Sequence, residues 1–232
     1  MVSEKEIKDW YNRKHCLKGE NAWRPFEAYS IFLDCLNAKP QRKLLDIGCG
    51  TGYLLKAADQ RGLETYGLDI SDEAVKIAES VCPKSKIIVG KGEDIHFADR
   101  SFDYVTCLGA LEHFLDIERG INEMARVGKD DALFCIMVPN AHFVFWRIRG
   151  RKGTEQQDIN ENLLTLRQWK ALLENNGLAI NHVYHDRWFM NQIEIFSTLN
   201  PLSILKNIML KLAWLFLPLG WTYQFVIVCR KR

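Results

Sequence analysis

Short apolar runs alternate with helical patterns through much of this chain. The runs that predict β-strands lie at Lys43–Ile47, Glu64–Leu68, Ile87–Val89, Asp103–Cys107 and Ala132–Val138. The helical patterns lie at 3–15, 25–37, 51–61, 72–81 and 113–127. Continuous apolar strands that are separated by helices indicate a parallel sheet with helices on both faces. The pattern therefore predicts an α/β fold.

The C-terminal third adds one more helix and two more strands. Thr165 can cap a helix that runs to about Asn176, because its hydroxyl can accept a bond from a free backbone N–H group of the first turn. Apolar strands are predicted at Leu178–Tyr184 and at Gln224–Cys229. No obvious linker divides the chain, so we expect a single domain over residues 1–232.

Composition narrows the classes of function. Lysine plus arginine total 31 and aspartate plus glutamate total 29, and this small excess of positive charge does not favour a nucleic-acid substrate. The seven cysteines include no C-x-x-C spacing, so we expect neither a disulfide framework nor a bound metal. The charged N-terminus lacks the apolar part of a secretory signal, and we expect a cytoplasmic location.

The strongest chemical signal is Leu44–Gly52, which reads LLDIGCGTG. It joins an apolar strand, an acid and three alternating glycines to the start of a helix. Glycines permit a tight turn and let a ligand approach the backbone N–H groups at the helix N-terminus. Seventeen residues after Gly52, the second strand ends in Asp69, where a carboxylate can hold a ribose diol.

The spacing of the glycines separates two nucleotide cofactors. A nicotinamide-binding loop has the pattern G-x-G-x-x-G, but its sixth position here is Tyr53. Asp46 is also harder to place beside a pyrophosphate than beside the ammonium group of an amino-acid-like ligand. The pattern favours a nucleoside that carries an amino acid, and dinucleotide binding is the alternative.

With these residues in view, the chain resembles the class I S-adenosylmethionine-dependent methyltransferases, particularly the small-molecule group that includes ubiquinone-pathway and glycan-cluster enzymes. Four segments carry the likeness in the family's order: 44–52, Asp69, Gly90–Phe97 (GKGEDIHF), and 101–113 with its SFDYV and LGALEH motifs. The likeness is good over roughly residues 40–140. It implies a Rossmann-like seven-stranded, mostly parallel sheet with an antiparallel last strand and helices on both faces.

The resemblance also implies S-adenosylmethionine as the cofactor and a role for each motif. By this match, Asp46 supports the cofactor's amino group, Asp69 binds its ribose, and Ile70 packs on the adenine. The other residues that it places around the cofactor are Gly48, Cys49, Gly50, Gly52, Gly92, Glu93, Asp94 and Leu108. The chain departs from the family pattern at Lys91, which is normally acidic, and at His96, which is normally proline.

Three polar residues near the ends of the fourth and fifth strands are candidates for catalysis. A base assists methyl transfer when the acceptor is a hydroxyl. His113 follows the fourth strand and His142 follows the fifth, so both are expected at the same edge of the sheet. Glu112 could orient His113 or an acceptor hydroxyl. The structural alternatives are histidines that cap or pack and a solvated acid at a helix start.

Three segments outside the core could contact an acceptor. Residues 21–26 combine two aromatic rings with Arg24 and suit either a lid or a helix packed on the sheet. Residues 143–152 interleave cations with aromatic rings and suit either an anionic group or a solvated face. Residues 202–217 are apolar with two lysines, which leaves open a packing or dimer helix and a helix at a membrane surface.

We therefore expect a methyltransferase that acts on a small-molecule, glycan or lipid-linked acceptor by O-methylation. Its parts would be N-terminal helices or a lid (1–39), a cofactor-binding core (40–140), substrate-side insertions (141–221) and the last strand (222–229). One alternative is a non-catalytic protein that binds S-adenosylmethionine and serves as an interaction partner. Another is an NAD-dependent oxidoreductase, which Tyr53 disfavours.

Overall fold

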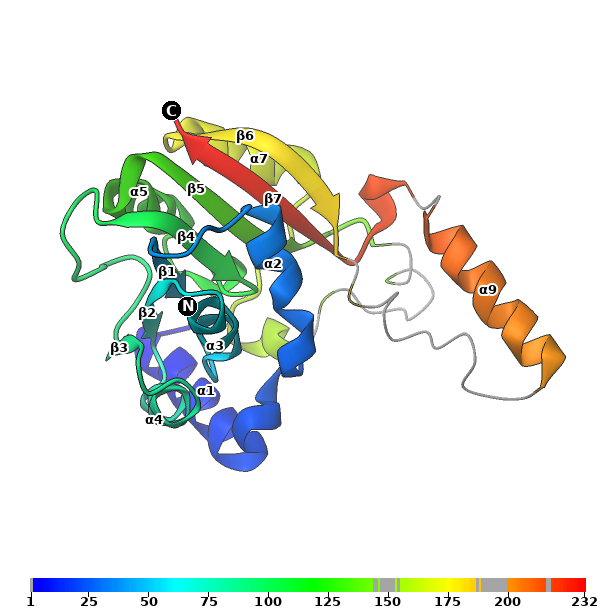
Figure 1. Ribbon diagram of the computed structural model, residues 1–232, viewed down its shortest axis with the longest axis horizontal. Helices are drawn as coiled ribbons and strands as arrows, with labels where there is room; N and C mark the ends of the chain where they lie inside the picture. Colours follow the sequence, from blue (N-terminus) through cyan, green and yellow to red (C-terminus); the bar gives the residue numbers. More distant parts are fainter. Residues whose placement is uncertain are drawn as a thin grey trace.

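A seven-stranded sheet forms the centre of the computed structural model (Figure 1), which describes residues 2–143, 146, 153, 155–186, 188, 200–215 and 218–232. The strands are β1 (Lys43–Ile47), β2 (Glu64–Asp69), β3 (Lys86–Val89), β4 (Phe102–Leu108), β5 (Gly128–Pro139), β6 (Leu178–His185) and β7 (Gln224–Lys231). Their order is β3-β2-β1-β4-β5-β7-β6, and β7 alone runs in the direction opposite to the other strands. The predicted sheet with an antiparallel last strand is confirmed.

The α-helices are α1 (Glu4–Lys18), α2 (Ser30–Cys35), α3 (Tyr53–Gln60), α4 (Asp72–Val81), α5 (Ile117–Val127), α7 (Leu166–Asn175) and α9 (Pro201–Leu215). Four of the helices named here, α1, α4, α5 and α7, begin directly after a residue whose side chain caps a first-turn N–H group. Ser3 and Thr165 each form a capping box, at the starts of α1 and α7. Ser71 caps α4 and Asp116 caps α5 in the same way, but without the reciprocal bond.

Three predicted helices were wrong in their limits. The helix expected at 25–37 is split into a 3₁₀ turn (Phe26–Ala28) and α2. The helix expected at 113–127 begins only at Ile117, because Asp116 caps it. The helix expected at 51–61 begins at Tyr53, because Gly52 has a left-handed backbone (φ 80°) that no right-handed helix can include.

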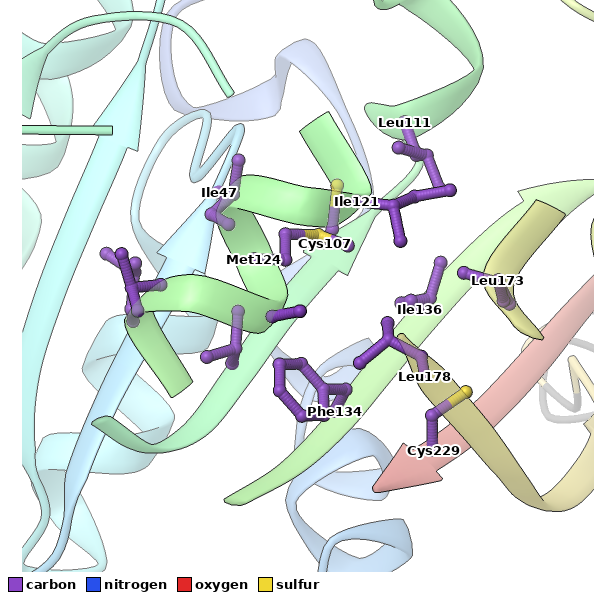
Figure 2. Packing of buried hydrophobic residues seen from close by; sticks show 14 of the residues in the cluster. Ile47, Cys107, Leu111, Ile121, Met124, Phe134, Ile136, Leu173, Leu178 and Cys229 are labelled. Atoms are coloured by element: carbon purple, nitrogen blue, oxygen red, sulfur yellow. The ribbon is translucent and has the colours of Figure 1, made fainter. Parts of the chain in front are cut away.

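Apolar side chains fill both faces of the sheet. On one face, Ile121 and Met124 of α5 lie against Cys107 of β4 and Ile136 of β5 (Figure 2). On the other face, a second cluster joins α2 and α3 to the sheet through residues such as Phe32. Near-complete burial on both faces explains why β1, β4 and β5 are continuous apolar runs.

The N-terminal segment, blue in Figure 1, is fixed to the core by polar contacts between residues far apart in the sequence. Lys8 of α1 forms an ion pair with Asp72 at the start of α4, at 2.8 Å. Asn12 Oδ1 accepts a bond from Ser71 Oγ at 2.7 Å. α1 therefore lies near the carboxyl end of β2, the strand that leads into α4.

The apolar segment predicted at 202–217 forms α9 over Pro201–Leu215, and its last two residues lie outside the described part of the chain. Figure 1 shows α9 standing apart from the sheet. Most of the predicted cationic segment 143–152 also lies outside the described residues. None of the helices in the described ranges combines the length and apolarity needed to cross a bilayer.

Candidate active site

A cavity of about 930 Å³ lies at the carboxyl ends of the parallel strands. This is the edge at which open α/β sheets bind ligands. One wall, here called the loop wall, comes from the loops after β1, β2 and β3 and contains Asp46, Gly48, Cys49, Gly50, Asp69, Ile70, Gly92 and Glu93. Another part of the lining, here called the helix wall, comes from helical segments and their ends and contains Tyr11, His15, Trp23, Glu112, His113 and Gln156.

The glycine loop is shaped by steric limits at two positions. Gly48 has a φ of +70°, and a Cβ added there would lie 2.4 Å from Ala110 Cβ. Gly50 has a φ of +52°, and its Cβ would lie 3.3 Å from the Trp23 ring. Only glycine combines this backbone with such close neighbours. The loop can therefore bring its backbone directly to the cavity surface.

The backbone N–H groups of this loop are already used within the chain. Gly48 N and Cys49 N donate to Leu68 O at 2.7 and 3.0 Å, and Gly50 N donates to Asp69 Oδ2 at 2.8 Å. These three N–H groups tie the turn to the end of β2, and the expectation that N–H groups at the start of α3 bind a ligand stays a prediction. The loop presents backbone surface and neighbouring carboxylates to the cavity.

Two buried acids stand on the loop wall. Asp69 accepts bonds from Gly50 N and from Ser71 N at 2.8 and 2.9 Å, which leaves other lone pairs of its two oxygens available. Asp46 accepts a bond from Thr106 Oγ1 at 2.7 Å. Burial raises the pKa of Asp46 to about 7, even though the Thr106 bond favours its charged form.

The part of the loop wall that follows β3 is tightly packed against the loop after β4. A Cβ on Gly92 would lie 2.1 Å from the Phe114 ring, so only glycine fits there. Glu93 Oε1 accepts a bond from Leu115 N at 2.9 Å, which fixes the loop after β4. Ile70 and Leu108 also line the cavity, as the sequence led us to expect.

Comparisons with known proteins address the same region. A family model described as "Methyltransferase domain" matches residues 45–136. The chain is 27% identical over 180 residues to the uncharacterized methyltransferase YcgJ of Bacillus subtilis, which covers 72% of this chain and 68% of that protein. It is 32% identical over 116 residues to a ubiquinone biosynthesis O-methyltransferase of Alkalilimnicola ehrlichii, which covers 48% of this chain and 43% of that enzyme.

The chain belongs to the class I S-adenosylmethionine-dependent methyltransferase family. It spans only about two fifths of the length of several curated relatives that it matches. Among solved structures, the crystal structure of YcgJ from the same Bacillus has a TM-score of 0.60 at 21% identity, covering 90% of this chain and 99% of that one. The [4+2]-cyclase SpnF has a TM-score of 0.70 at 15% identity, covering 99% and 96%. These structural likenesses concern the fold alone.

The loop wall of this methyltransferase fits the cofactor of its family, S-adenosylmethionine. The left-handed glycines leave backbone surface where any other residue would place a side chain. Asp46, whose pKa is raised by burial without a cation, has the chemistry to receive an ammonium group. Asp69 has free lone pairs for hydroxyl groups.

Three predicted site residues of the methyltransferase lie outside the cavity lining. Gly52 begins α3 and packs against α4, since a Cβ there would lie 2.8 Å from Cys82 Sγ. Asp94 is exposed beside His96, at 3.4 Å from its Nε2. His142 is exposed, and its backbone N–H donates to Asn140 Oδ1. His142 follows β5 at the right edge of the sheet, but the turn at Asn140 directs it away from the cavity lining.

Glu112 and His113 do line the cavity, on the 3₁₀ turn Leu111–His113 that follows β4. His113 Nδ1 lies 2.6 Å from Asn160 O, so this nitrogen carries the proton and donates. Its unprotonated Nε2 lies 3.1 Å from the side-chain amide of Gln156, which would donate its N–H to Nε2 with its oxygen and nitrogen exchanged. Burial lowers the pKa of His113 and raises the pKa of Glu112 to about 8. Both side chains are therefore uncharged near neutral pH.

Sequence reasoning missed Tyr11, His15 and Gln156 of the helix wall. Tyr11 and His15 are four residues apart on α1, so they share one face of that helix. Their ring contacts extend along the cavity, with Tyr11 6.0 Å from the His113 ring and His15 6.1 Å from the Trp23 ring, between ring centroids. Two aromatic-type residues at this spacing were a usable signal, but nothing in the sequence placed α1 over the sheet.

Proposed function

We propose that this methyltransferase moves the methyl group of S-adenosylmethionine to a hydroxyl oxygen of a small-molecule acceptor. The observation that carries the proposal is one cavity with two different walls, a loop wall suited to the cofactor and a helix wall with Glu112 and His113. Named relatives include O-methyltransferases of ubiquinone biosynthesis, which are compatible with a hydroxyl acceptor, and a demethylmenaquinone methyltransferase.

The residues of the loop wall would position the cofactor. Asp46 would receive its ammonium group, Asp69 its ribose hydroxyls, and Ile70 and Leu108 would pack on the adenine. When bound, the cofactor supplies an electrophilic methyl group on a sulfonium. The protein's main contribution is then to align the acceptor oxygen with that methyl group and to exclude water.

The helix wall would handle the acceptor's proton. A hydroxyl acceptor that takes the methyl group would lose its proton to a neighbouring base. His113 Nε2 is unprotonated when Nδ1 donates to Asn160, so it can accept this proton once the acceptor displaces Gln156. Glu112 Oε1 lies 3.9 Å from the same nitrogen, and positive charge on His113 would favour the ionised form of Glu112.

A binding and turnover experiment tests this proposal. S-Adenosylhomocysteine should bind in calorimetry and NAD should not, and Asp69→Asn should weaken binding while Asp130→Asn, at the exposed start of β5, should not. Labelled S-adenosylmethionine should then transfer its methyl group to the small-molecule fraction of a cell extract. Binding of NAD in place of S-adenosylhomocysteine would overturn the proposal. Binding without any transfer would support the non-catalytic alternative.

A second proposal concerns α9 and a membrane surface. Leu202, Leu205, Met209 and Leu212 lie on one stripe of α9 and are 77%, 55%, 62% and 49% exposed. The helix carries Lys206 and Lys211 and no acidic residue. An apolar stripe with cations suits the surface of an anionic bilayer, and a lipid-linked or other amphipathic acceptor would then reach the cavity from that surface.

Vesicle binding tests the second proposal. We expect the protein to sediment with phosphatidylglycerol vesicles at low salt and the double variant Leu205→Glu/Met209→Glu to stay in solution. Leu17→Glu, at a leucine of α1 that is 85% exposed, is the matched control and should sediment like the unchanged protein. If the double variant sediments as well as the control, α9 is not the contact.

A further inference from the structure

Residues 159–164, here called the strap, connect the loop after β4 with the loop after β5. Asn162 donates to Glu112 O twice, from its backbone N and from its side-chain Nδ2, each at 2.9 Å. Ala141 N donates to Leu164 O at 3.1 Å. Both loops contribute residues to the cavity lining, whereas the strap itself does not. The strap therefore holds two parts of the lining in place from outside it.

Within the strap, Asn160 contacts His113 and its neighbour through three hydrogen bonds. The backbone O of Asn160 lies 2.6 Å from His113 Nδ1. The side-chain Nδ2 of Asn160 donates to His113 O and to Phe114 O, each at 3.1 Å. Both the ring and the backbone of His113 are therefore held by the same residue. Because a carbonyl oxygen can only accept, the ring carries its proton on Nδ1 and leaves Nε2 unprotonated.

The backbone of Asn160 is unusual. Its φ is +99°, whereas the other non-glycine residues with positive φ in the described part of the chain, Asn37, Gln41 and Arg100, have values of 47–63°, near the centre of the left-handed region. A residue held in a sparsely populated conformation costs folding free energy, and such residues concentrate at functional sites. The carbonyl that meets His113 Nδ1 belongs to this residue, so its direction depends on the unusual backbone.

The three bonds have different consequences. The two side-chain bonds of Asn160 are sufficient to hold the turn after β4, and they would do so with either form of the histidine ring. The bond from Nδ1 to the Asn160 carbonyl decides instead which ring nitrogen carries the proton. The unprotonated Nε2 faces the side chain of Gln156, which lines the cavity. The strained residue therefore determines a chemical property of the cavity as well as the shape of a turn.

We propose that Asn160 is a positioning residue that fixes His113 in the tautomer with an unprotonated Nε2. It does so through a left-handed backbone that its own side chain stabilises by its bonds to the turn. This inference rests on the proposed function, in which His113 Nε2 receives the proton of the acceptor. Asn160 itself contacts neither cofactor nor acceptor and acts only through His113.

The first test measures the tautomer in the unchanged protein. The ring nitrogens of ¹⁵N-labelled histidines are observed by NMR at pH 7.5 with S-adenosylhomocysteine bound, since protonated and unprotonated ring nitrogens differ in chemical shift. The chain has six histidines, and the signal of His113 is the one that disappears in His113→Gln. We expect a proton on Nδ1 and none on Nε2. A proton on Nε2, or a mixture of the two tautomers, would overturn the inference.

A pair of variants isolates the backbone of Asn160. Asn160→Gly and Asn160→Ala remove the same two side-chain bonds, but only glycine adopts a positive φ without steric cost. The ratio of the two His113 tautomers should fall about tenfold in Asn160→Ala, the effect of one lost hydrogen bond, and less than threefold in Asn160→Gly. Methyl transfer from labelled S-adenosylmethionine to the small-molecule fraction of a cell extract should be about tenfold slower in Asn160→Ala than in Asn160→Gly.

The matched control pair is Gln41→Gly and Gln41→Ala. Gln41 also has a positive φ, of 63°, but it is exposed and precedes β1, at the edge of the sheet away from the cavity. Its alanine variant should lose thermal stability relative to its glycine variant, and the His113 tautomer should be the same in both. Equal tautomer ratios in folded Asn160→Gly and Asn160→Ala would overturn the inference.

The inference and the proposed function fail in distinguishable ways. If Asn160→Ala does not fold, the unchanged protein and Asn160→Gly still decide, because a proton on Nε2 in either would overturn the inference. If the tautomers follow the expected pattern but His113→Gln transfers methyl groups as fast as the unchanged protein, the role proposed for His113 is wrong and its positioning by Asn160 stands.

Discussion

The two walls of the cavity satisfy their polar groups in different ways. On the loop wall, the backbone N–H groups of residues 48–50 donate to Leu68 and Asp69, and Thr106 donates to Asp46. On the helix wall, Glu112 and His15 each keep an unpartnered buried atom. The backbone N–H groups of residues 48–50 in the loop wall are satisfied without a ligand, as suits a cofactor shared by a whole family. The helix wall is incomplete, as suits a site whose ligand is particular to this protein.

The largest expected effect comes from breaking the loop wall. Gly48→Ala should reduce the free energy of unfolding by about 3–5 kcal/mol, because the new Cβ has both an unfavourable left-handed backbone and a clash with Ala110. Gly177→Ala is the matched control, since Gly177 has a φ of +86° but its Cβ would lie 3.9 Å from Ala125 Cβ. Urea denaturation measures both. Equal losses in the two variants would show that the close approach to Ala110 has no role.

The next effect tests how the helix wall is held. Arg24 donates to both carboxylate oxygens of Asp186, which is 6% exposed, and so ties the N-terminal segment to the end of β6. Arg24→Met should cost about 2–3 kcal/mol in urea denaturation, because it leaves a buried carboxylate without its cation. The double variant Arg24→Met/Asp186→Leu should recover part of this loss. No recovery would mean that the ion pair is not what stabilises the contact.

The same contrast explains what the sequence could predict. The loop wall depends on residues that are close in the sequence, LLDIGCGTG and the strand end at Asp69, so its place at the sheet edge was predictable. The helix wall depends on how the N-terminal segment docks, through contacts such as Lys8 with Asp72 and Arg24 with Asp186, which lie 64 and 162 residues apart. No local pattern encodes these distances.

Local geometry limited the prediction in the loop wall as well. The sequence placed glycines where backbone N–H groups could meet a ligand, but those groups bond to the end of β2. It also placed His142 at the correct edge, but the bond from His142 N to Asn140 Oδ1 belongs to a turn that turns the side chain outward. Both differences concern hydrogen-bond partners, which a pattern of residue types does not specify.

The third prediction concerns the charge of the helix wall. The folded-state pKa of Glu112 is about 8, against an ordinary value of 4.5, so the folded protein holds a proton that the unfolded chain releases. This contribution to stability is present at low pH and is lost as the pH rises through about 8. Glu112→Gln has no acidic proton to lose. Its free energy of unfolding should therefore exceed that of the unchanged protein by about 1–3 kcal/mol at pH 8.5, and by less at pH 5.

Denaturation curves at the two pH values measure the Glu112 effect, with Glu118→Gln as the control. Glu118 is exposed on α5, so its replacement should leave the difference from the unchanged protein the same at both pH values. If the free energies of unfolding of Glu112→Gln and of the unchanged protein differ by the same amount at both pH values, the carboxyl group of Glu112 is ionised at neutral pH. The neutral character of the helix wall would then be lost.

The smallest expected effect concerns the loop wall and is a proton linked to cofactor binding. Asp46 has a folded-state pKa of about 7, and an ammonium group beside it would favour its charged form. Below pH 7 the protein must therefore release a proton to bind S-adenosylhomocysteine, and its affinity should fall by up to about tenfold per pH unit. Calorimetry from pH 7.5 down to 5.5 measures this slope.

Asp46→Asn separates this acid from its neighbour. Burial also raises the pKa of Asp69, so some pH dependence could come from that residue. Asp46→Asn should bind more weakly at pH 7.5 and with a much shallower pH slope, because the amide cannot titrate. If the slope survives this change, the proton belongs to Asp69. The loop wall would then recognise the amino group of its ligand without Asp46, and Asp69 at the end of β2 would be the acid that titrates on binding.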